Sequence, residues 1–141
     1  MRALSLVRPL PWAILNADCL VIDWLEEITH RGDIAIRASK RWDSKALLRV
    51  QRTASGVFGC SGVKTAHPAD AIVAVAEIVD CIALADLQSR GAAWRRQATW
   101  AQGPWCAVIS NVRRTRLVPC SGARGWFNVD DAIVAEALRA A

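Results

Sequence analysis

Tyrosine is absent from this sequence of 141 residues, and only one methionine and three lysines occur in it. Long hydrophobic segments are absent too, because no apolar run reaches the ~18 residues that a transmembrane helix needs. A short apolar run near the N-terminus is interrupted by Arg8 and two prolines, whereas a signal peptide needs an unbroken apolar core and a cleavage site of small residues. We therefore expect a cytoplasmic protein without a membrane segment.

The cysteines do not form a metal-binding or disulfide pattern. Their number is odd, and no two have the C-x-x-C spacing of zinc knuckles and redox motifs. The histidines, His30 and His67, add no metal-ligand spacing, and nothing in the sequence pairs His30 with a nucleophilic cysteine. We expect no metal and no cofactor, and buried cysteines at most of the five positions: Cys19, Cys60, Cys81, Cys106 and Cys120.

The chain has enough hydrophobic residues to fold around one core. They make up 53% of the sequence, against 22% charged residues, and this balance excludes an intrinsically disordered chain. A length of 141 residues suits one domain and is short for two independent cores. No internal repeat or low-complexity segment is present. We interpret residues 1–141 as a single domain.

The positive charge comes almost entirely from arginine. The formal net charge is +5, and all but three of the 18 basic residues are Arg. Arginine binds phosphate through two parallel hydrogen bonds and stacks on bases, and the seven tryptophans would supply stacking surfaces. A GC-rich coding bias, which also favours Arg and Ala, explains the arginine content equally well, and tryptophan is mainly a core residue.

The hydrophobic pattern predicts a protein dominated by short strands. Strands are predicted at 1–8, 19–22, 33–38, 71–82 and 105–112, and helices at 11–16, 43–51, 83–89 and 130–140. Asp43 is the expected cap of one helix, and Asn128 or Asp130 the cap of the last. The Gly- and Ser-rich residues 53–64 are interpreted as a mobile loop. The fold class is α+β and mainly β: a small barrel with short peripheral helices and a C-terminal helix.

Four segments resemble the ASCH family, in the order in which that family has them. They are MRALSLVRPLPWAILN (1–16), HRGDIAIRASKRW (30–42), DAIVAVAEIVDC (70–81) and GPWCAVISNVRRTRLVPCSGARGWF (103–127). The family has a strand followed by QPW, an RG-strand-HASK segment, GAIVGVAEIVDC, and GPW with VLSNVRRL and VPCRGALGLW. The resemblance leaves out 43–68, a variable loop or insertion. It implies a PUA-like β-barrel that binds RNA or modified nucleosides; some members hydrolyse acylated cytidine or cleave RNA.

The sequence departs from the family where catalysis would be expected. The family's GxKxxExR-like signature aligns with residues 17–24, where Cys19 takes the place of Lys, Ile22 that of Glu or Thr, and Trp24 that of Arg. An isoleucine side chain can neither transfer a proton nor act as a nucleophile. QPW is also changed, to Arg8-Pro9-Leu10. The resemblance therefore implies a divergent binder rather than an enzyme of the family's kind.

The strand at 33–38 leads into Ser39-Lys40-Arg41-Trp42, which would place a cation, a hydroxyl and an indole at the barrel mouth. A solvated turn with Trp42 packed inward is the alternative. Likewise, the arginines after Ser110 would hold a nucleic-acid backbone or would protect an edge strand from pairing. The candidate nucleic-acid-binding residues are Arg8, Asp23, Trp24, Arg37, Ser39, Lys40, Trp42, Ser110, Asn111 and Arg113.

Two further features have two or more interpretations each. Trp94-Arg95-Arg96 combines bases with an aromatic residue, as single-strand binders do, but a helix with one core tryptophan explains it as well. Glu77 interrupts an apolar strand, so it would pair with an arginine such as Arg37, sit in a pocket, or point outward.

Three functions remain open at this point. The first is a non-catalytic module that binds RNA or a modified nucleotide. The second is a hydrolase of modified nucleosides, similar to the acylcytidine amidohydrolases, or of RNA, with a rearranged active site. The third is an interaction protein whose barrel binds a protein partner. The sequence does not indicate an oligomeric state.

Overall fold

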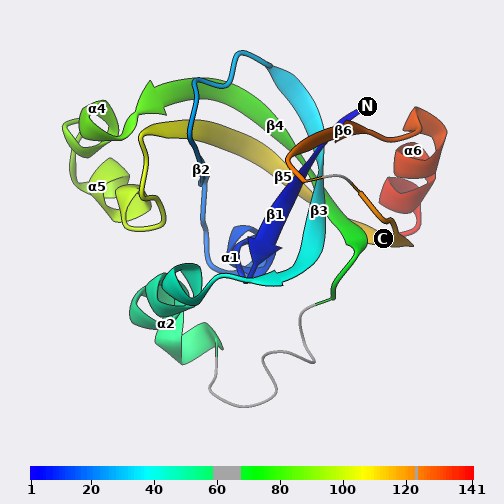
Figure 1. The fold of residues 1–141 in the computed structure, drawn as a ribbon, viewed down its shortest axis with the longest axis horizontal. Helices are drawn as coiled ribbons and strands as arrows, with labels where there is room; N and C mark the ends of the chain where they lie inside the picture. The colour runs from blue at the N-terminus through cyan, green and yellow to red at the C-terminus, as the bar shows by residue number, and fades with distance from the viewer. Residues whose placement is uncertain (59–67, 123) are drawn as a thin grey trace.

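The computed structural model describes residues 1–58, 68–122 and 124–141, and these ranges contain six strands and five helices (Figure 1). The strands are β1 (Arg2–Arg8), β2 (Val21–Trp24), β3 (Gly32–Trp42), β4 (Ala71–Ala83), β5 (Trp105–Pro119) and β6 (Trp126–Asn128). The helices are α1 (Leu10–Asn16), α2 (Ser44–Phe58), α4 (Leu84–Gln88), α5 (Ala92–Ala98) and α6 (Asp131–Arg139). The protein is therefore α+β, as the sequence predicts. None of these helices has the length and apolar character needed to cross a membrane.

All six strands belong to one curved sheet. Its order is β2-β5-β4-β3-β1-β6, and its pairs are antiparallel except for the parallel pair of β1 and β3. The sheet is not closed, so the predicted barrel is not confirmed. The edge strands β2 and β6 are short and meet through side chains: the rings of Trp24 and Trp126 pack edge to face, with centroids 6.4 Å apart. An aromatic contact joins the two edges where a closed barrel would have a hydrogen-bonded ladder.

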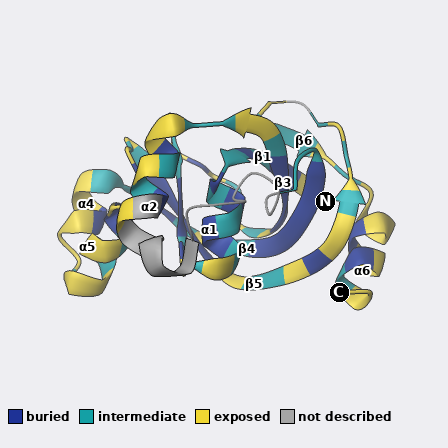
Figure 2. Cartoon of the chain, turned by 90° about the horizontal axis from the view of Figure 1, so that it is seen from below, coloured by how far each residue is buried: buried dark blue, intermediate teal, exposed yellow. Residues whose placement is uncertain are grey.

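The two faces of the sheet are covered by different cores. On the concave side, buried residues such as Leu4, Ile36 and Ile78 form the main core, and α1 lies within the curve of the strands (Figure 2). On the convex side, Ala35 and Val75 pack with Val134 of α6. Strand β4 is buried on both faces from Ala71 to Ala76, as its unbroken apolar run predicts.

Several predicted boundaries are wrong. Strand β3 continues through Trp42 instead of ending at Ala38, because its parallel partner β1 extends far enough to place Arg8 beside Trp42. Residues 53–58, predicted as loop, belong to α2, whereas 59–67 lie outside the described residues. Strand β5 extends to Pro119, and the short β6 had no sequence signal.

Two predicted helix caps are confirmed. The Asp43 carboxylate accepts a hydrogen bond from the Lys45 amide at 2.9 Å, before α2. The Asp130 carboxylate accepts one from the Ala132 amide at 2.8 Å and caps α6. Each cap satisfies an amide that the first turn of a helix leaves without an intrahelical acceptor. In α1, Pro11 occupies the first turn, where its missing amide proton costs nothing.

Candidate functional site

The predicted groups at the end of β3 gather around Arg8 of the neighbouring strand. The Arg8 guanidinium donates a hydrogen bond to the Lys40 carbonyl and lies over the Trp42 ring, 4.8 Å from its centroid. The Ser39 hydroxyl accepts a hydrogen bond from the Arg41 amide at 3.3 Å. Parallel pairing of β1 and β3 brings these residues together although Arg8 and Trp42 are far apart in sequence. The result is a basic and aromatic cluster in which Arg8, Ser39 and Trp42 are partly buried and Lys40 and Arg41 are exposed.

Arg37, one of the predicted nucleic-acid contacts, instead lies inside the protein with 6% of its surface exposed. Its Nε donates to the Cys120 carbonyl at 2.7 Å, its Nη1 to the Ser5 hydroxyl at 3.0 Å, and its Nη2 to the Asp70 carboxylate at 2.6 Å. Gly122 makes room for it, because a Cβ there would lie 2.8 Å from the Arg37 Cδ. Arg37 therefore holds β1, β3 and the start of β4 together.

Asp70 connects this buried arginine to the surface. Its second carboxylate oxygen lies 3.5 Å from the Nζ of Lys40, whose side chain is 80% exposed. Lys40 is thus the solvent-facing member of a charge network whose inner member is Arg37. The predicted alternative in which Arg37 pairs with Glu77 is wrong, because the partner of Arg37 is Asp70.

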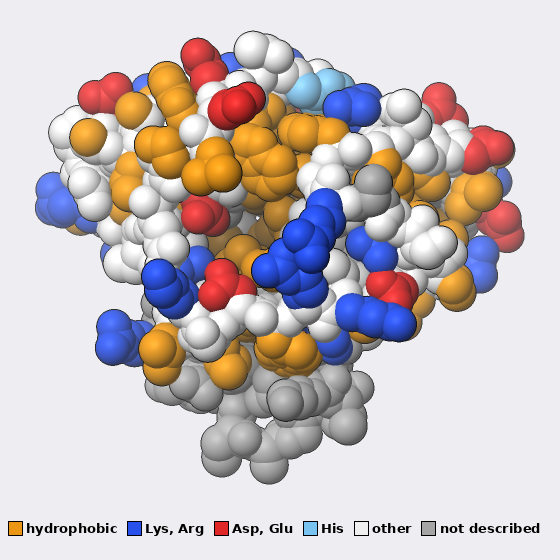
Figure 3. Space-filling view, viewed as in Figure 1, with side chains coloured by type: hydrophobic (Ala, Val, Ile, Leu, Met, Phe, Trp, Pro, Cys, Tyr) orange, Lys and Arg blue, Asp and Glu red, His pale blue; other side chains and the backbone are white. Residues whose placement is uncertain are grey.

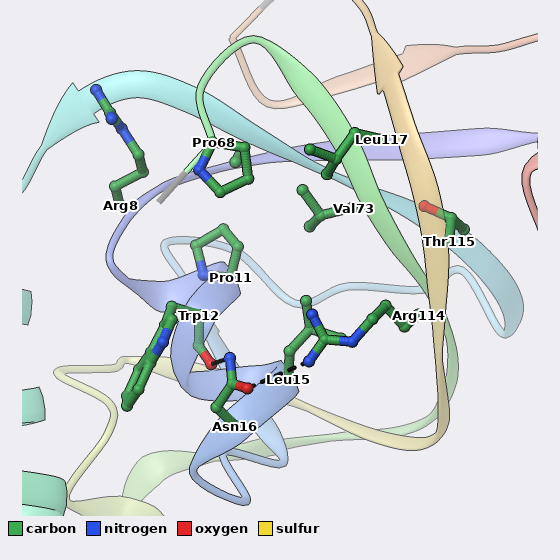
Figure 4. Close-up of a pocket in the computed structure, with 11 residues that line it drawn as sticks. Arg8, Pro11, Trp12, Leu15, Asn16, Pro68, Val73, Arg114, Thr115 and Leu117 are labelled. Atoms are coloured by element: carbon green, nitrogen blue, oxygen red, sulfur yellow. Dashed lines mark hydrogen bonds between the residues drawn. The ribbon is translucent and has the colours of Figure 1, made fainter. Parts of the chain in front are cut away.

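A pocket of about 390 Å³ opens between α1 and strands β3, β4 and β5 (Figure 4). We call it the pocket under α1. Its walls are mostly apolar, and polar groups from Arg8, Asn16, Arg114 and Thr115 stand among them. Pockets of this size and polarity hold small molecules with a flat apolar body and a few polar atoms. The lining residues are Arg8, Pro11, Trp12, Leu15, Asn16, Ala38, Pro68, Val73, Arg114, Thr115 and Leu117.

Thr115 is the buried polar residue of this pocket. It is 4% exposed, and its hydroxyl, which Figure 4 shows turned toward the pocket interior, has no hydrogen-bond partner among the described residues. A buried hydroxyl left unpaired costs roughly 1–3 kcal/mol. Thr115 is thus a polar group for which a ligand in the pocket could supply the partner.

Arg114 crosses from β5 toward α1 at the rim of the pocket. Its guanidinium donates to the Asn16 side-chain oxygen at 3.2 Å, and Asn16 in turn donates to the Trp12 carbonyl at 3.0 Å (Figure 4). A second hollow adjoins the pocket and shares Leu15 and Arg114 with it. Asn111, a predicted contact, lines this second hollow.

The other predicted residues of β5 lie near Asn111. Asn111 adopts a left-handed backbone conformation with φ of 50°, at an irregularity where β5 carries extra residues relative to β4. Asparagine tolerates this conformation better than most residues. Ser110 is exposed, and Arg113 reaches across β4 to the Asp33 carboxylate at 2.7 Å. Arg113 is therefore held by an ion pair on the surface.

Asp23 and Trp24, also predicted contacts, do not join the pocket under α1. They line a separate hollow with Leu25, Glu26 and Gly103. Trp24 contributes to the contact between the sheet edges described above. The ten predicted residues are thus divided among a cluster at the β1 and β3 ends, a stretch of β5 and the β2 edge, with Arg37 buried.

The two positions at which the sequence departs from the family signature lie in the core. Cys19 is 0% exposed and Ile22 is 3% exposed. Burial raises the pKa of the Cys19 thiol from 9.0 to about 12, so this group is a neutral thiol at physiological pH. Neither position presents a reactive group to a ligand.

The remaining sequence features also have defined places. Cys19, Cys81 and Cys106 are buried free thiols, Cys120 is partly buried, and Cys60 lies outside the described residues. Within those residues no cluster of His, Cys, Asp and Glu could hold a metal ion. Trp94 packs against the core from α5, as the helix interpretation of its segment predicts.

The face shown in Figure 3 has a hollow near its centre, with hydrophobic side chains inside it and charged side chains of both signs around it. The acidic residues are unevenly spread along the chain, since none occurs between Asp43 and Asp70 or between Asp86 and Asp130. The second of these segments includes all of β5. The pocket wall that β5 forms therefore carries basic and neutral side chains only.

Sequence reasoning missed Thr115, Asn16 and Trp12 as pocket residues and left Arg114 between a nucleic-acid backbone contact and edge protection. The sequence contained one signal for Thr115, which lies between Arg114 and Arg116 in a predicted basic strand end. Side chains alternate between the faces of a strand, so Thr115 would face inward if the two arginines faced solvent. The chain matches no protein-family model and no curated protein.

Proposed function

We propose that this chain is an ASCH-type, PUA-like module that binds RNA or a modified nucleotide without catalysing a reaction. The observation that carries the proposal is the pocket under α1, with its apolar walls and the buried hydroxyl of Thr115. A nucleobase has two flat apolar faces and a polar edge, which match these walls and this hydroxyl.

The surroundings of the pocket suit the rest of a nucleotide. Arg8 and Arg114 line the pocket, and Arg8 donates to the backbone carbonyl of Lys40, whose side chain is exposed. Phosphate oxygens would accept from these cations, while the stacked pair of Arg8 and Trp42 offers a surface for a neighbouring base. We assign recognition of the base to the pocket and attachment of the backbone to the cluster at the β1 and β3 ends.

The absence of catalysis is proposed because the positions that carry the reactive groups in the family signature are here a buried isoleucine and a buried neutral thiol. A hydrolase built on other residues would release product from acylated cytidine or from mixed RNA. Turnover of either substrate by the folded protein would refute the non-catalytic part of the proposal.

Titrations test the binding part. Fluorescent single-stranded and hairpin RNA should bind with sub-millimolar affinity that falls as salt rises, because phosphate contacts release counterions. Acylated cytidine, which carries no phosphate, should bind in the pocket with little dependence on salt. An RNA affinity that does not change between 50 and about 200 mM salt would contradict the proposed backbone contacts. If neither RNA nor acylated cytidine binds, the proposed function fails.

A further inference from the structure

Another hollow, of about 470 Å³, lies between α2 and α5, away from those described above, and is lined by Arg49, Arg52, Arg96 and Thr99. Arg49 and Arg52 are three positions apart on α2, and Arg96 of α5 stands three positions before Thr99, the residue that caps the C-terminal end of α5. Residues at this spacing share one helix face, so each helix turns a pair of side chains toward the hollow. Three arginine side chains therefore line one hollow; Arg52 and Arg96 are exposed, and Arg49 is partly buried.

Arg49 is placed unfavourably for a protein without a ligand. Its Nε and Nη1 atoms are buried and have no hydrogen-bond partner among the described residues. A buried lysine or histidine can lose its proton, whereas arginine keeps its charge in proteins. Burial of an unpaired charged donor is costly, and an anion is the group that would remove this cost.

Among the described residues, no carboxylate forms an ion pair with the three arginines that line this hollow. None of the ion pairs in the described part of the chain includes Arg49, Arg52 or Arg96. The arginines that do pair with an aspartate or glutamate are Arg31, Arg37, Arg90, Arg113 and Arg116. The sequence has no Asp or Glu from 44 to 69 or from 87 to 129, the stretches that contain both helices. The Thr99 hydroxyl donates a hydrogen bond to the Arg96 backbone carbonyl at 2.6 Å. Thr99 is neutral, so it does not compensate the positive charge of the three arginines.

We propose that this hollow binds a phosphate group. Each guanidinium can donate two parallel hydrogen bonds, and a phosphate has enough oxygen atoms to accept from three of them at once. The phosphate can be free or can belong to a nucleotide or an RNA backbone, since the chemistry recognised is the same. This site is separate from the pocket under α1, since no residue that the structure describes lines both.

The first experiment uses inorganic phosphate with the full chain. Calorimetric titration at constant ionic strength should show binding, and the Tm should rise by about 4 °C at phosphate ten times above its Kd, relative to chloride. The double variant Arg52→Gln/Arg96→Gln should lose both effects. Arg95→Gln/Arg139→Gln removes the same charge from exposed helix positions outside the hollow and should keep them.

Arg49→Met provides a second test, in which the Tm without phosphate is expected to stay equal or to rise. Methionine keeps an apolar stem but removes the buried unpaired nitrogens, so the Tm in phosphate-free chloride buffer should equal or exceed that of the wild type. In phosphate the same variant should gain nothing, whereas the wild type gains. A variant that is less stable than the wild type without phosphate, yet responds to phosphate normally, would overturn the assignment of Arg49.

Two further probes identify the source of the phosphate. If a nucleoside 5′-monophosphate or a short RNA loses at least fivefold in affinity in Arg52→Gln/Arg96→Gln but not in the control, the site holds a nucleotide or backbone phosphate. If only inorganic phosphate shows this loss, the site holds the free anion. An equal response of both double variants to all three probes would overturn the proposal. Acylated cytidine has no phosphate, so its binding tests the pocket under α1 independently.

Discussion

Two arginines of this protein, the buried Arg37 and the partly buried Arg49, differ in how their charge is compensated. Arg37 has every nitrogen engaged, with a carbonyl, a hydroxyl and a carboxylate as partners within 3.0 Å. Arg49 has two buried nitrogens, and neither has a hydrogen-bond partner in the described part of the chain. A guanidinium whose bonds are completed within the chain fixes the fold, whereas one whose bonds are incomplete is available for an external anion. The number of arginines in the sequence does not distinguish these roles.

The largest expected effect is that of Arg37→Met. The substitution removes the buried member of an ion pair and leaves the Asp70 carboxylate, which is 32% exposed, without its main cation. Loss of a buried partner typically costs about 3–5 kcal/mol. The free energy of unfolding, measured by urea denaturation, should fall by that amount. Arg37→Lys should restore little of it, because one ammonium cannot reach three acceptors in the planar arrangement of a guanidinium.

Arg113→Met is the matched control for this substitution. Arg113 also pairs with an aspartate at about the same distance, but its side chain is 32% exposed against 7% for Arg37. An exposed pair contributes only about 0–1 kcal/mol. Equal losses in the two variants would show that burial is not what makes Arg37 structural.

The next largest expected effect is a loss of stability at high pH due to Cys19, whose buried thiol is neutral in the folded protein. Burial raises the pKa of its thiol from 9.0 to about 12, so the unfolded chain loses this proton at a lower pH than the folded protein does. The stability due to the neutral buried thiol is therefore complete below pH 9 and is lost as the pH rises from 9 toward 12. Linkage gives a slope of about 1.4 kcal/mol per pH unit in that window.

Urea denaturation at pH 8, 9, 10 and 11 measures this slope for the wild type and for Cys19→Ala. The alanine variant should be less stable at pH 8, because it leaves a small cavity, but should lose less stability as the pH rises. Other groups that titrate in this range, including Cys106, are common to both chains and cancel in the comparison. Parallel curves would refute the contribution of Cys19.

Thr115→Val should have a smaller effect and the opposite sign. Valine has nearly the same shape and lacks the hydroxyl, for which the described residues supply no hydrogen-bond partner, so the free energy of unfolding should rise by about 1 kcal/mol. The same change should weaken binding of acylated cytidine about five- to tenfold, which corresponds to one lost hydrogen bond. Thr115→Ser keeps the hydroxyl and should retain binding. A destabilised valine variant with unchanged binding would contradict the role proposed for the hydroxyl.

The sequence predicts the elements of this fold better than their extent. The apolar run at 71–82 and the alternation at 33–38 identify β4 and β3, because burial on one or both faces leaves a pattern of period two or a continuous run. The end of β3 depends on its partner β1, and no local pattern near Trp42 records that pairing. Strand β6 has three residues, too few for any periodicity.

The candidate sites were harder to predict because they depend on contacts between distant segments. The sequence identified Arg8, Lys40 and Trp42, which cluster in space, but it also placed Arg37 among the surface contacts although that side chain is buried. In strand 33–38 an arginine among apolar residues has the same pattern whether it faces solvent or a buried aspartate. The spacing of Arg49 and Arg52 was visible in the sequence, whereas the position of Arg96 opposite them was not.

Lys40→Ala should have the smallest effect on stability and the clearest effect on salt dependence. Its ammonium lies 3.5 Å from Asp70, but the side chain is 80% exposed, so the free energy of unfolding should change by about 0.5 kcal/mol or less. If Lys40 contacts an RNA phosphate, the affinity for RNA should fall a fewfold, and the slope of log K against log salt should decrease by about one. Lys45→Ala removes the same charge from an exposed position on α2. If both variants lower affinity and slope equally, Lys40 acts through net charge alone, and the cluster around Arg8 is then a structural feature like Arg37.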